Sequence, residues 1–361
     1  DCQTIARVRN PIYNNELDFL KKQFGLSMII NPEQASASEI ARVFRFPSAI
    51  KVDTFAKGRI ELFHIRIPAG SILIDAQITD IRNKLKCDVL VCVVLRDNQT
   101  IIPNGDFVFA QNDIISIVAT PSKANAFFQK IGIETNHVKN AILVGGGKIS
   151  YYLAKRLLMS GIAVKIIELD KDRCEELSEL LPDASIINGD GTDQNLLFEE
   201  GIEKAHGFAA LTDVDEENIV LSLFAKNISQ AKTITKINRI NFIDVVNQLN
   251  LDSILYPRLI TADYIIQYVR SMHKSIGSNV ENLYKLNASA EALGFAIKEE
   301  SSVTNIPFET LRIKKNILIC CIMRNGNIII PGGQDSIQVG DTVIIVLNNY
   351  RIHDITDILE A

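Results

Sequence analysis

The sequence predicts an α/β protein in which tandem parallel-sheet units are each followed by a small α+β module, and in which the first parallel-sheet unit is incomplete. Three observations support this prediction. Residues 139–275 alternate apolar strands with helical periodicity, a glycine-rich turn follows the first of these strands, and two long stretches of the chain repeat each other. At 361 residues the chain is long enough to form two or more domains.

Six short apolar runs between residues 139 and 275 are expected to be strands, in the order AILVG, AVKIIEL, ASIIN, GFAALT, KTITKI and DSILYP. Helical periodicity lies between them, most clearly in ISYYLAKRLLMS, RCEELSELL and ENIVLSLFAKNIS. Strand and helix that alternate in this way give a parallel sheet covered by helices on both faces. A six-stranded Rossmann fold is the predicted product.

The small modules are predicted from an internal repeat. LVCVVLRDNQTIIPNGD (90–106) aligns with LICCIMRNGNIIIPGGQ (318–334) at an offset of 228 residues. Upstream, QFGLSMIINPEQASASEI (23–40) aligns with QLNLDSILYPRLITADYI, and QTIARVRN (3–10) aligns with KTITKINR, at offsets of 225 and 229. Chance similarity of short Ile-rich strands explains one such match, but three collinear matches favour a duplication.

The duplication divides the chain into four segments. We expect the end of a first Rossmann unit in residues 1–57, a first small module in 58–137, a complete second Rossmann unit with a crossover helix in 138–282, and a second small module in 283–361. Nothing in the first copy corresponds to the glycine-rich turn of the second. We therefore expect either that the chain is part of a longer one or that it is naturally shortened.

The glycine-rich turn has the spacing of a dinucleotide-binding loop, with Ser150 in place of the third glycine. Gly145 permits a tight turn, and Gly147 lets the backbone approach a pyrophosphate. The amides that open the following helix, from Lys148 and Ile149 onward, add hydrogen-bond donors and a partial positive charge. By itself this motif is weak, since such a turn can also be purely structural.

An acid at the end of the second strand strengthens the motif. Glu168 lies 21 residues after Gly147, where a carboxylate accepts hydrogen bonds from ribose hydroxyls and repels a 2′-phosphate, which favours NAD(H) or an adenine nucleotide over NADP. The alternative is an ordinary exposed acid. Asp190, Gly191 and Thr192 follow the third strand, and a plain Asp-Gly turn is an equally good interpretation of these three residues. Thr212 and Asp213 at the end of the fourth strand and Lys236 on the fifth are further candidates.

Composition excludes some classes of function. A net charge of −5 without a basic run provides no electrostatic footprint for nucleic acid. The six cysteines contain no CxxC pair and the five histidines are dispersed, so we predict no metal site and reduced, buried cysteines. The apolar runs are too short to span a bilayer. We expect a soluble protein.

The motifs GGGKIS, IIELD, NGDGT and LTDVDEEN, together with the two small modules, resemble the regulator of K⁺ conductance family (RCK, or KTN), and within it the TrkA-type subunits of potassium uptake. The resemblance implies RCK C-terminal modules after each Rossmann unit. It also implies pyrophosphate contacts at Gly145, Gly147 and Lys148, a ribose contact at Glu168, and a basic residue on the fifth strand, at Arg7 in the first unit and Lys236 in the second. Lysine lacks the bidentate fork of arginine, so the contact at Lys236 is expected to be weaker.

The resemblance further implies a regulatory subunit that binds NAD(H) or ATP/ADP, forms a dimer or tetramer ring, and gates a Trk-type K⁺-translocating membrane protein from the cytoplasm, at the inner face of the membrane. Two other classes remain open. An NAD-dependent oxidoreductase needs an acid–base residue, and Tyr151 and Lys155 have the spacing of a Tyr-xxx-Lys pair. They belong to the helix directly after the glycine loop, so we interpret the match as coincidence. A passive scaffold would leave the loop empty.

Overall fold

The computed structural model describes residues 2–9, 17–55, 60–97, 99–133, 137–241, 243–246, 248–249, 251–274, 280–286, 289–348, 350 and 352–360. The chain forms two compact units, each built from two stretches of sequence. We call the first the parallel-sheet unit, made of Asp1–Pro47 and Asn136–Tyr264. The second is the antiparallel-sheet unit, made of Ser48–Thr135 and Ile265–Ala361.

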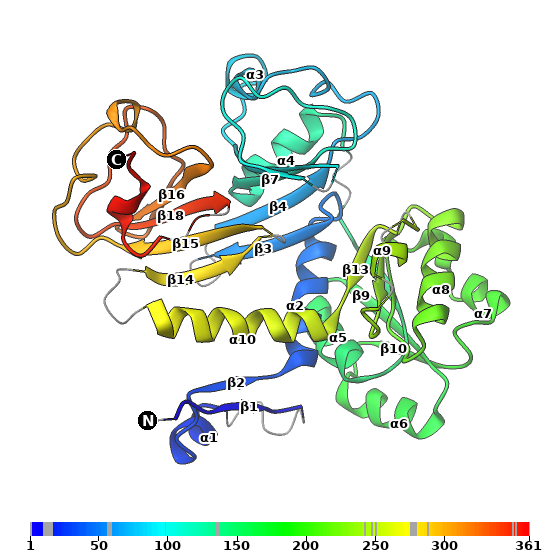
Figure 1. The fold of residues 1–361 in the computed structure, drawn as a ribbon. Helices are drawn as coiled ribbons and strands as arrows, with labels where there is room; N and C mark the ends of the chain where they lie inside the picture. The colour runs from blue at the N-terminus through cyan, green and yellow to red at the C-terminus, as the bar shows by residue number, and fades with distance from the viewer. Residues whose placement is uncertain are drawn as a thin grey trace. The chain divides into compact units, whose positions relative to one another are not determined.

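The parallel-sheet unit contains the predicted six-stranded sheet, in the order β10-β9-β8-β11-β12-β13, with every pairing parallel. This is the doubly wound order of a Rossmann fold, so the predicted fold class is confirmed. Figure 1 shows the strands of this sheet in shades of green. The strands are β8 (Asn140–Val144), β9 (Ala163–Glu168), β10 (Ser185–Asn188), β11 (Gly207–Ala210), β12 (Lys232–Lys236) and β13 (Ser253–Leu255). The helices are α5 (Lys148–Met159), α6 (Lys171–Leu180), α7 (Gln194–Glu199), α8 (Asp215–Ile228) and α9 (Ile243–Val246), and α10 (Pro257–Lys274) begins in this unit and ends in the antiparallel-sheet unit.

Helices cover both faces of this sheet because neighbouring strand residues point to opposite sides. Leu143 packs in one buried cluster with side chains of α5 and α6, whereas Ile142 and Val144 pack in another with side chains of α7 and α8. Burial on both faces explains why these strands are continuous apolar runs rather than alternating ones.

The segment before residue 47 packs onto the same unit. Strands β1 (Ile5–Arg7) and β2 (Met28–Ile30) form a separate two-stranded parallel sheet, and helices α1 (Leu17–Gln23) and α2 (Pro32–Arg45) follow them. Ala37, Ile40 and Phe44 of α2 belong to the buried cluster that contains α5. The amide of Asn31, which caps α2, donates to the Tyr152 hydroxyl of α5 at 3.0 Å.

The antiparallel-sheet unit contains two five-stranded sheets of identical topology, β3-β4-β7-β5-β6 and β14-β15-β18-β16-β17. The first has β3 (Lys51–Phe55), β4 (Ile60–Arg66), β5 (Leu90–Arg96), β6 (Gln99–Ile101) and β7 (Ile114–Ala119), with helices α3 (Ile78–Asn83) and α4 (Pro121–Lys130). The second has β14 (Val280–Lys285), β15 (Ala290–Ala296), β16 (Ile317–Arg324), β17 (Asn327–Ile329) and β18 (Thr342–Asn348). Both appear in Figure 1, in blue to cyan and in yellow to red.

Matching details within the two sheets support the duplication. Both β5 and β16 shift register at a cysteine, Cys92 in one and Cys320 in the other, 228 residues apart. These two buried cysteines meet, with their Sγ atoms 3.3 Å apart. Five of the six cysteines are buried as expected, but Cys2 is exposed.

Each small module begins earlier than its expected boundary. Strand β3 starts at Lys51 and pairs with β4, so the first module's sheet begins before residue 58. Strand β14 starts at Val280, before residue 283. Neither of these edge strands has a clear alternating pattern that would separate it from the preceding segment in the sequence. Among the described residues, no helix is both long and apolar enough to cross a membrane.

Candidate nucleotide-binding site

The predicted loop connects β8 to α5 and has the conformation that its glycines suggest. Gly145 has φ +98°, and a Cβ there would lie 3.0 Å from the backbone of Leu211 and Thr212. Only glycine meets both conditions. At Gly147, the N-cap of α5, a Cβ would meet nothing within 4 Å. The loop is therefore tight at its start and open to the solvent at its end.

Two further residues hold the loop in place. The Ser150 hydroxyl donates a hydrogen bond to the Gly145 carbonyl, and its side chain is fully buried. Ser150 thus fits where the motif has a third glycine. A Cβ at Gly146 would lie 2.7 Å from Cδ1 of Leu177 and 2.9 Å from the Glu168 carboxylate, so a larger residue here would displace these two side chains.

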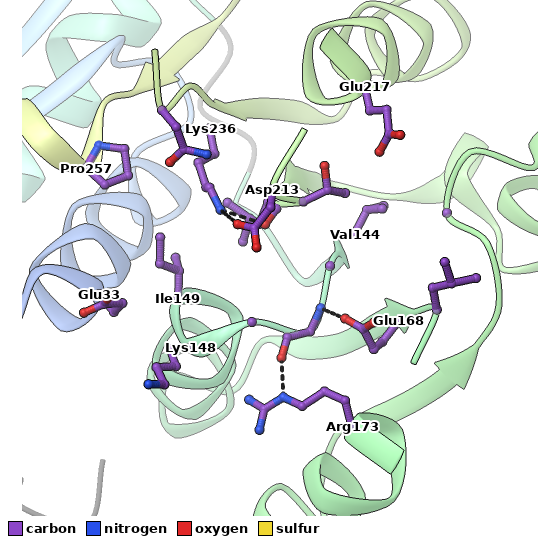
Figure 2. Close-up of a pocket in the computed structure, with 18 of the residues that line it drawn as sticks. Glu33, Val144, Lys148, Ile149, Glu168, Arg173, Asp213, Glu217, Lys236 and Pro257 are labelled. Atoms are coloured by element: carbon purple, nitrogen blue, oxygen red, sulfur yellow. Dashed lines mark hydrogen bonds and ion pairs between the residues drawn. The ribbon is translucent and has the colours of Figure 1, made fainter. Parts of the chain in front are cut away.

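A cavity of about 980 Å³ opens at the carboxyl edge of the sheet, above the loop. This edge is where parallel α/β sheets bind ligands. Figure 2 shows side chains from several elements around it. Twelve of the thirteen predicted site residues line it, namely Arg7, Gly145, Gly147, Lys148, Ile149, Glu168, Asp190, Gly191, Thr192, Thr212, Asp213 and Lys236. Ser150 does not line it and lies beneath the loop.

Glu168 ends β9 and contacts the loop directly. One of its carboxylate oxygens accepts the amide hydrogen of Gly146, and the other accepts that of Asp170 at 2.8 Å. Arg173 of α6 donates from Nε to the Gly146 carbonyl at 2.8 Å, as Figure 2 shows. Each oxygen of a carboxylate accepts more than one hydrogen bond, so Glu168 retains capacity for two hydroxyl donors.

The Asp190–Thr192 turn is both structural and part of the cavity wall. The Asp190 carboxylate accepts hydrogen bonds from the backbone and hydroxyl of Thr192, which lower the pKa of Asp190. A Cβ at Gly191 would lie 2.2 Å from Cγ1 of Val144, so the turn packs tightly against the end of β8. The Asp-Gly turn and the ligand wall are therefore compatible interpretations of the same residues.

Lys236 and its neighbours form the wall opposite the loop. The Lys236 side chain is largely buried, and its Nζ contacts the Asp213 carboxylate at 2.8 Å and the Leu211 carbonyl at 3.3 Å. Asp213 is almost fully exposed. The buried Asn218 donates to the backbone carbonyls of Thr212 and Lys236, which ties together the ends of β11 and β12.

Residues of the amino-terminal segment complete the cavity. Arg9 contacts Glu33 at 2.5 Å, and Arg7 lies 3.9 Å from the same carboxylate oxygen. The corresponding residues of the second repeat also line the cavity. Arg7 and Arg9 correspond to Lys236 and Asn238, and Pro32 and Glu33 correspond to Pro257 and Arg258. Sequence reasoning missed Arg9, Glu33 and Arg173. The two-residue spacing from Arg7 was the available signal for Arg9.

Tyr151 and Lys155, which have the spacing of a Tyr-xxx-Lys pair, lie elsewhere. Tyr151 packs against the buried cluster of the sheet and against the Tyr152 ring, and Lys155 is exposed on α5. Neither is among the described residues that line the cavity. Within the part of the chain that the structure describes, no three His, Cys, Asp or Glu side chains gather as metal ligands.

Comparisons with known proteins identify the family of the chain. The TrkA-N domain model matches residues 141–257, and the TrkA-C domain model matches residues 62–132. The Trk system potassium uptake protein TrkA homolog 1 of Methanosarcina mazei is 33% identical over 347 residues, which cover 96% of this chain and 76% of that protein. The Trk system potassium uptake protein TrkA of Haemophilus influenzae is 30% identical over 354 residues, with the same coverage.

Solved structures support the fold. The GsuK RCK domain has a TM-score of 0.57 at 15% identity and covers 96% of this chain and 72% of its own. A GsuK channel bound to NAD has a TM-score of 0.56 at 15% identity, with 96% of this chain and 60% of that one covered. The glycine loop, the acid after the second strand and the paired modules thus occur in a chain that belongs to the TrkA family of Trk system potassium uptake proteins.

Proposed function

We propose that the cavity binds NAD(H), with ATP and ADP as alternative ligands. The observation that carries this proposal is that the open end of the glycine loop and the Glu168 carboxylate line one cavity. The first amides of α5 offer donors to a pyrophosphate, and Glu168 offers acceptors to ribose hydroxyls. The NAD-bound GsuK channel, which shares the fold, supports the same ligand class.

Cations on the facing wall suit a ligand with phosphates. Arg7 and Arg9 come from the amino-terminal segment and Lys236 from β12, and all three line the cavity. Each is already paired with a carboxylate, Glu33 for the arginines and Asp213 for the lysine. A bound phosphate would compete with those carboxylates, so ligand binding would rearrange this wall. Arginine is the stronger partner because its fork binds phosphate bidentately.

The proposed role of this rearrangement is regulation. The chain acts as a nucleotide-responsive subunit that gates a Trk-type K⁺-translocating membrane protein, and it catalyses no reaction. It works as a homo-oligomeric ring, a dimer or a tetramer, in the cytoplasm at the inner face of the cell membrane. The names of its TrkA relatives support potassium transport. A nucleotide can shift such a gate only through different affinities for its two states.

An oxidoreductase is the alternative of another class. It requires an acid–base residue beside the nicotinamide, and the Tyr151–Lys155 pair does not line the cavity. The experiment is to co-purify the full chain with a Trk-type membrane subunit, and to assay NADH oxidation with simple carbonyl substrates in parallel. Stable co-purification without turnover is expected. Steady NADH oxidation, or failure to bind any such membrane protein, would favour the alternative.

A further inference from the structure

A second charged pair lies beside the proposed ribose site, on α6. Arg173 lines the cavity, and Glu168 and Arg173 contact the same loop residue, Gly146, through its N–H and its carbonyl. The Gly146 amide donates to Glu168, and the Gly146 carbonyl accepts from Nε of Arg173 at 2.8 Å. The Arg173 guanidinium and the carboxylate that would hold the ribose hydroxyls thus contact the same residue of the loop.

The guanidinium is neutralised by a neighbour on its own helix. Nη1 of Arg173 contacts the Glu176 carboxylate at 2.5 Å, three residues along α6. The Arg173 side chain is 24% exposed and that of Glu176 is 58% exposed. Nη2 has no hydrogen-bond partner among the described residues. Arg173 thus keeps a free donor at the cavity, while the Arg173–Glu176 pair as a whole has no net charge.

This arrangement bears on which dinucleotide fits. NADP(H) differs from NAD(H) by a 2′-phosphate, which is placed where Glu168 would accept the ribose hydroxyl, and an arginine near this position is what accommodates that phosphate. Arg173 has the chemistry for this role, but Glu176 occupies one arm of its fork and adds a negative charge. We propose that Glu176, through its pair with Arg173, is a second determinant of the preference for NAD(H) over NADP(H). The inference rests on the proposed function, since it concerns the same cavity.

The test is calorimetric titration of the full chain with NADH and with NADPH. Glu176→Gln keeps the shape of the side chain and removes its charge, which frees the Arg173 fork. We expect NADPH affinity to rise about fivefold, in keeping with the strength of an exposed ion pair, while NADH affinity changes less than about twofold. Adding Arg173→Met to Glu176→Gln should abolish the gain in the NADPH-to-NADH ratio.

Glu175→Gln is the matched control. Glu175 is the adjacent residue of the same helix, has the same charge, is 70% exposed, and faces Lys171 at 3.9 Å instead of Arg173. This variant should leave the ratio unchanged. If NADH still binds, the inference would be overturned by an unchanged NADPH-to-NADH affinity ratio in Glu176→Gln. An equal gain in that ratio in Glu175→Gln would overturn it too. A wild-type chain that binds neither dinucleotide would overturn the proposed function as well.

Discussion

At position 147, the backbone does not itself require glycine. Gly147 has φ −66°, and a Cβ would meet nothing within 4 Å. A valine therefore fits the unliganded chain but fills the space through which a pyrophosphate approaches the loop. We predict that Gly147→Val lowers NADH affinity at least about a hundredfold at an unchanged melting temperature, as measured by calorimetry.

Lys155→Val provides the matched control for that variant. Lys155 is exposed two turns along the same helix and does not line the cavity. The Lys155→Val variant should bind NADH with the affinity of the wild type. Wild-type affinity in a folded Gly147→Val chain would show that the loop does not bind the nucleotide.

Glu168 is expected to contribute both affinity and selectivity. Its two carboxylate oxygens each accept one backbone amide hydrogen and still have capacity for ribose hydroxyls. Glu168→Ala should weaken NADH binding about tenfold, the loss of a charge-assisted hydrogen bond, and narrow the difference between NADH and NADPH. Titration of both ligands measures this. Equal affinity of the wild type for NADH and NADPH would remove the basis for the ribose assignment.

The residues of the candidate site differ in how far the sequence predicts them. Gly145 and Glu168 follow from spacing alone, because a strand, a turn and a helix fix where each must lie. Arg9 and Glu33 line the same cavity only because α2 packs on α5. Arg173 lines it because of the way α6 is rotated about its axis, which decides which of its side chains face the cavity. Such contacts arise from tertiary packing, which local patterns do not encode.

Among the described residues, each small module has an arginine–aspartate ion pair with a buried aspartate at the same place in its sheet. Arg96 holds Asp113 through Nε at 2.7 Å and Nη2 at 2.6 Å, and Arg324 holds Asp341 through the same atoms at 2.9 and 2.8 Å. Both aspartates are almost completely buried. Removing the arginine leaves a buried carboxylate without its counter-ion, which is costly.

We predict that Arg96→Met lowers the free energy of unfolding by about 3 kcal/mol, and that Arg324→Met has an effect of similar size in its own module. Hydrogen exchange of the β7 and β18 amides would report each loss separately. Arg66→Met, at an exposed residue at the end of β4, is the control and should change stability by less than about 0.5 kcal/mol. Equal protection of the β7 amides from hydrogen exchange in the wild type and in Arg96→Met would contradict the stabilising role given to this ion pair.

The first module contains a row of contacting polar side chains that the second module lacks among the described residues. This difference predicts that the two modules respond differently to acid. His64 contacts Asp53 at 2.9 Å and Ser116 at 2.9 Å, and Lys51 contacts Asp53 at 2.8 Å. Burial raises the pKa of the Asp53 carboxyl, but the charges and hydrogen bonds of Lys51 and His64 outweigh burial and lower that pKa well below its ordinary value. The second module has Gly294 and Ile344 at the positions of His64 and Ser116, since Gly294 pairs with Ile344 as His64 pairs with Ser116.

A carboxyl whose pKa is lower in the folded state stabilises the fold above its unfolded pKa, and that contribution is lost as the pH falls. We predict that β3 and β4 lose protection from hydrogen exchange below about pH 4, the unfolded pKa of aspartate, before β14 and β15 do. Asp53→Asn should cost about 2 kcal/mol at pH 7 and remove this acid dependence. The same acid profile in Asp53→Asn and the wild type would contradict this account.

At the scale of elements, the apolar strands of the parallel sheet were easier to predict than the edge strands of the small modules. The six parallel strands are apolar on both faces, so their sequences identify them even without alternation. Strands β3 and β14 begin before the expected boundaries at residues 58 and 283, since edge strands are short and partly polar and depend on their neighbours for pairing. The repeat predicted that two modules exist but not their first residues.

At the scale of the whole molecule, duplication predicted most of the architecture. The 228-residue offset between Cys92 and Cys320 anticipated two sheets of one topology. Sequence alone did not predict that the segment before residue 47 would supply Arg7 and Arg9 to the cavity of the second copy. In the proposed mechanism, this shared wall is where nucleotide phosphates compete with Glu33 and Asp213.

The measurement that tests regulation most directly is K⁺ flux in liposomes that contain a Trk-type membrane subunit and the full chain, titrated with NADH, NAD, ATP and ADP. The account predicts that the nucleotides affect flux unequally, by about fivefold or more between the strongest and the weakest, because coupling requires different affinities for two states. It also predicts that Gly147→Val removes these differences while the complex remains intact. Equal flux with every nucleotide, or an undiminished response in Gly147→Val, would contradict it.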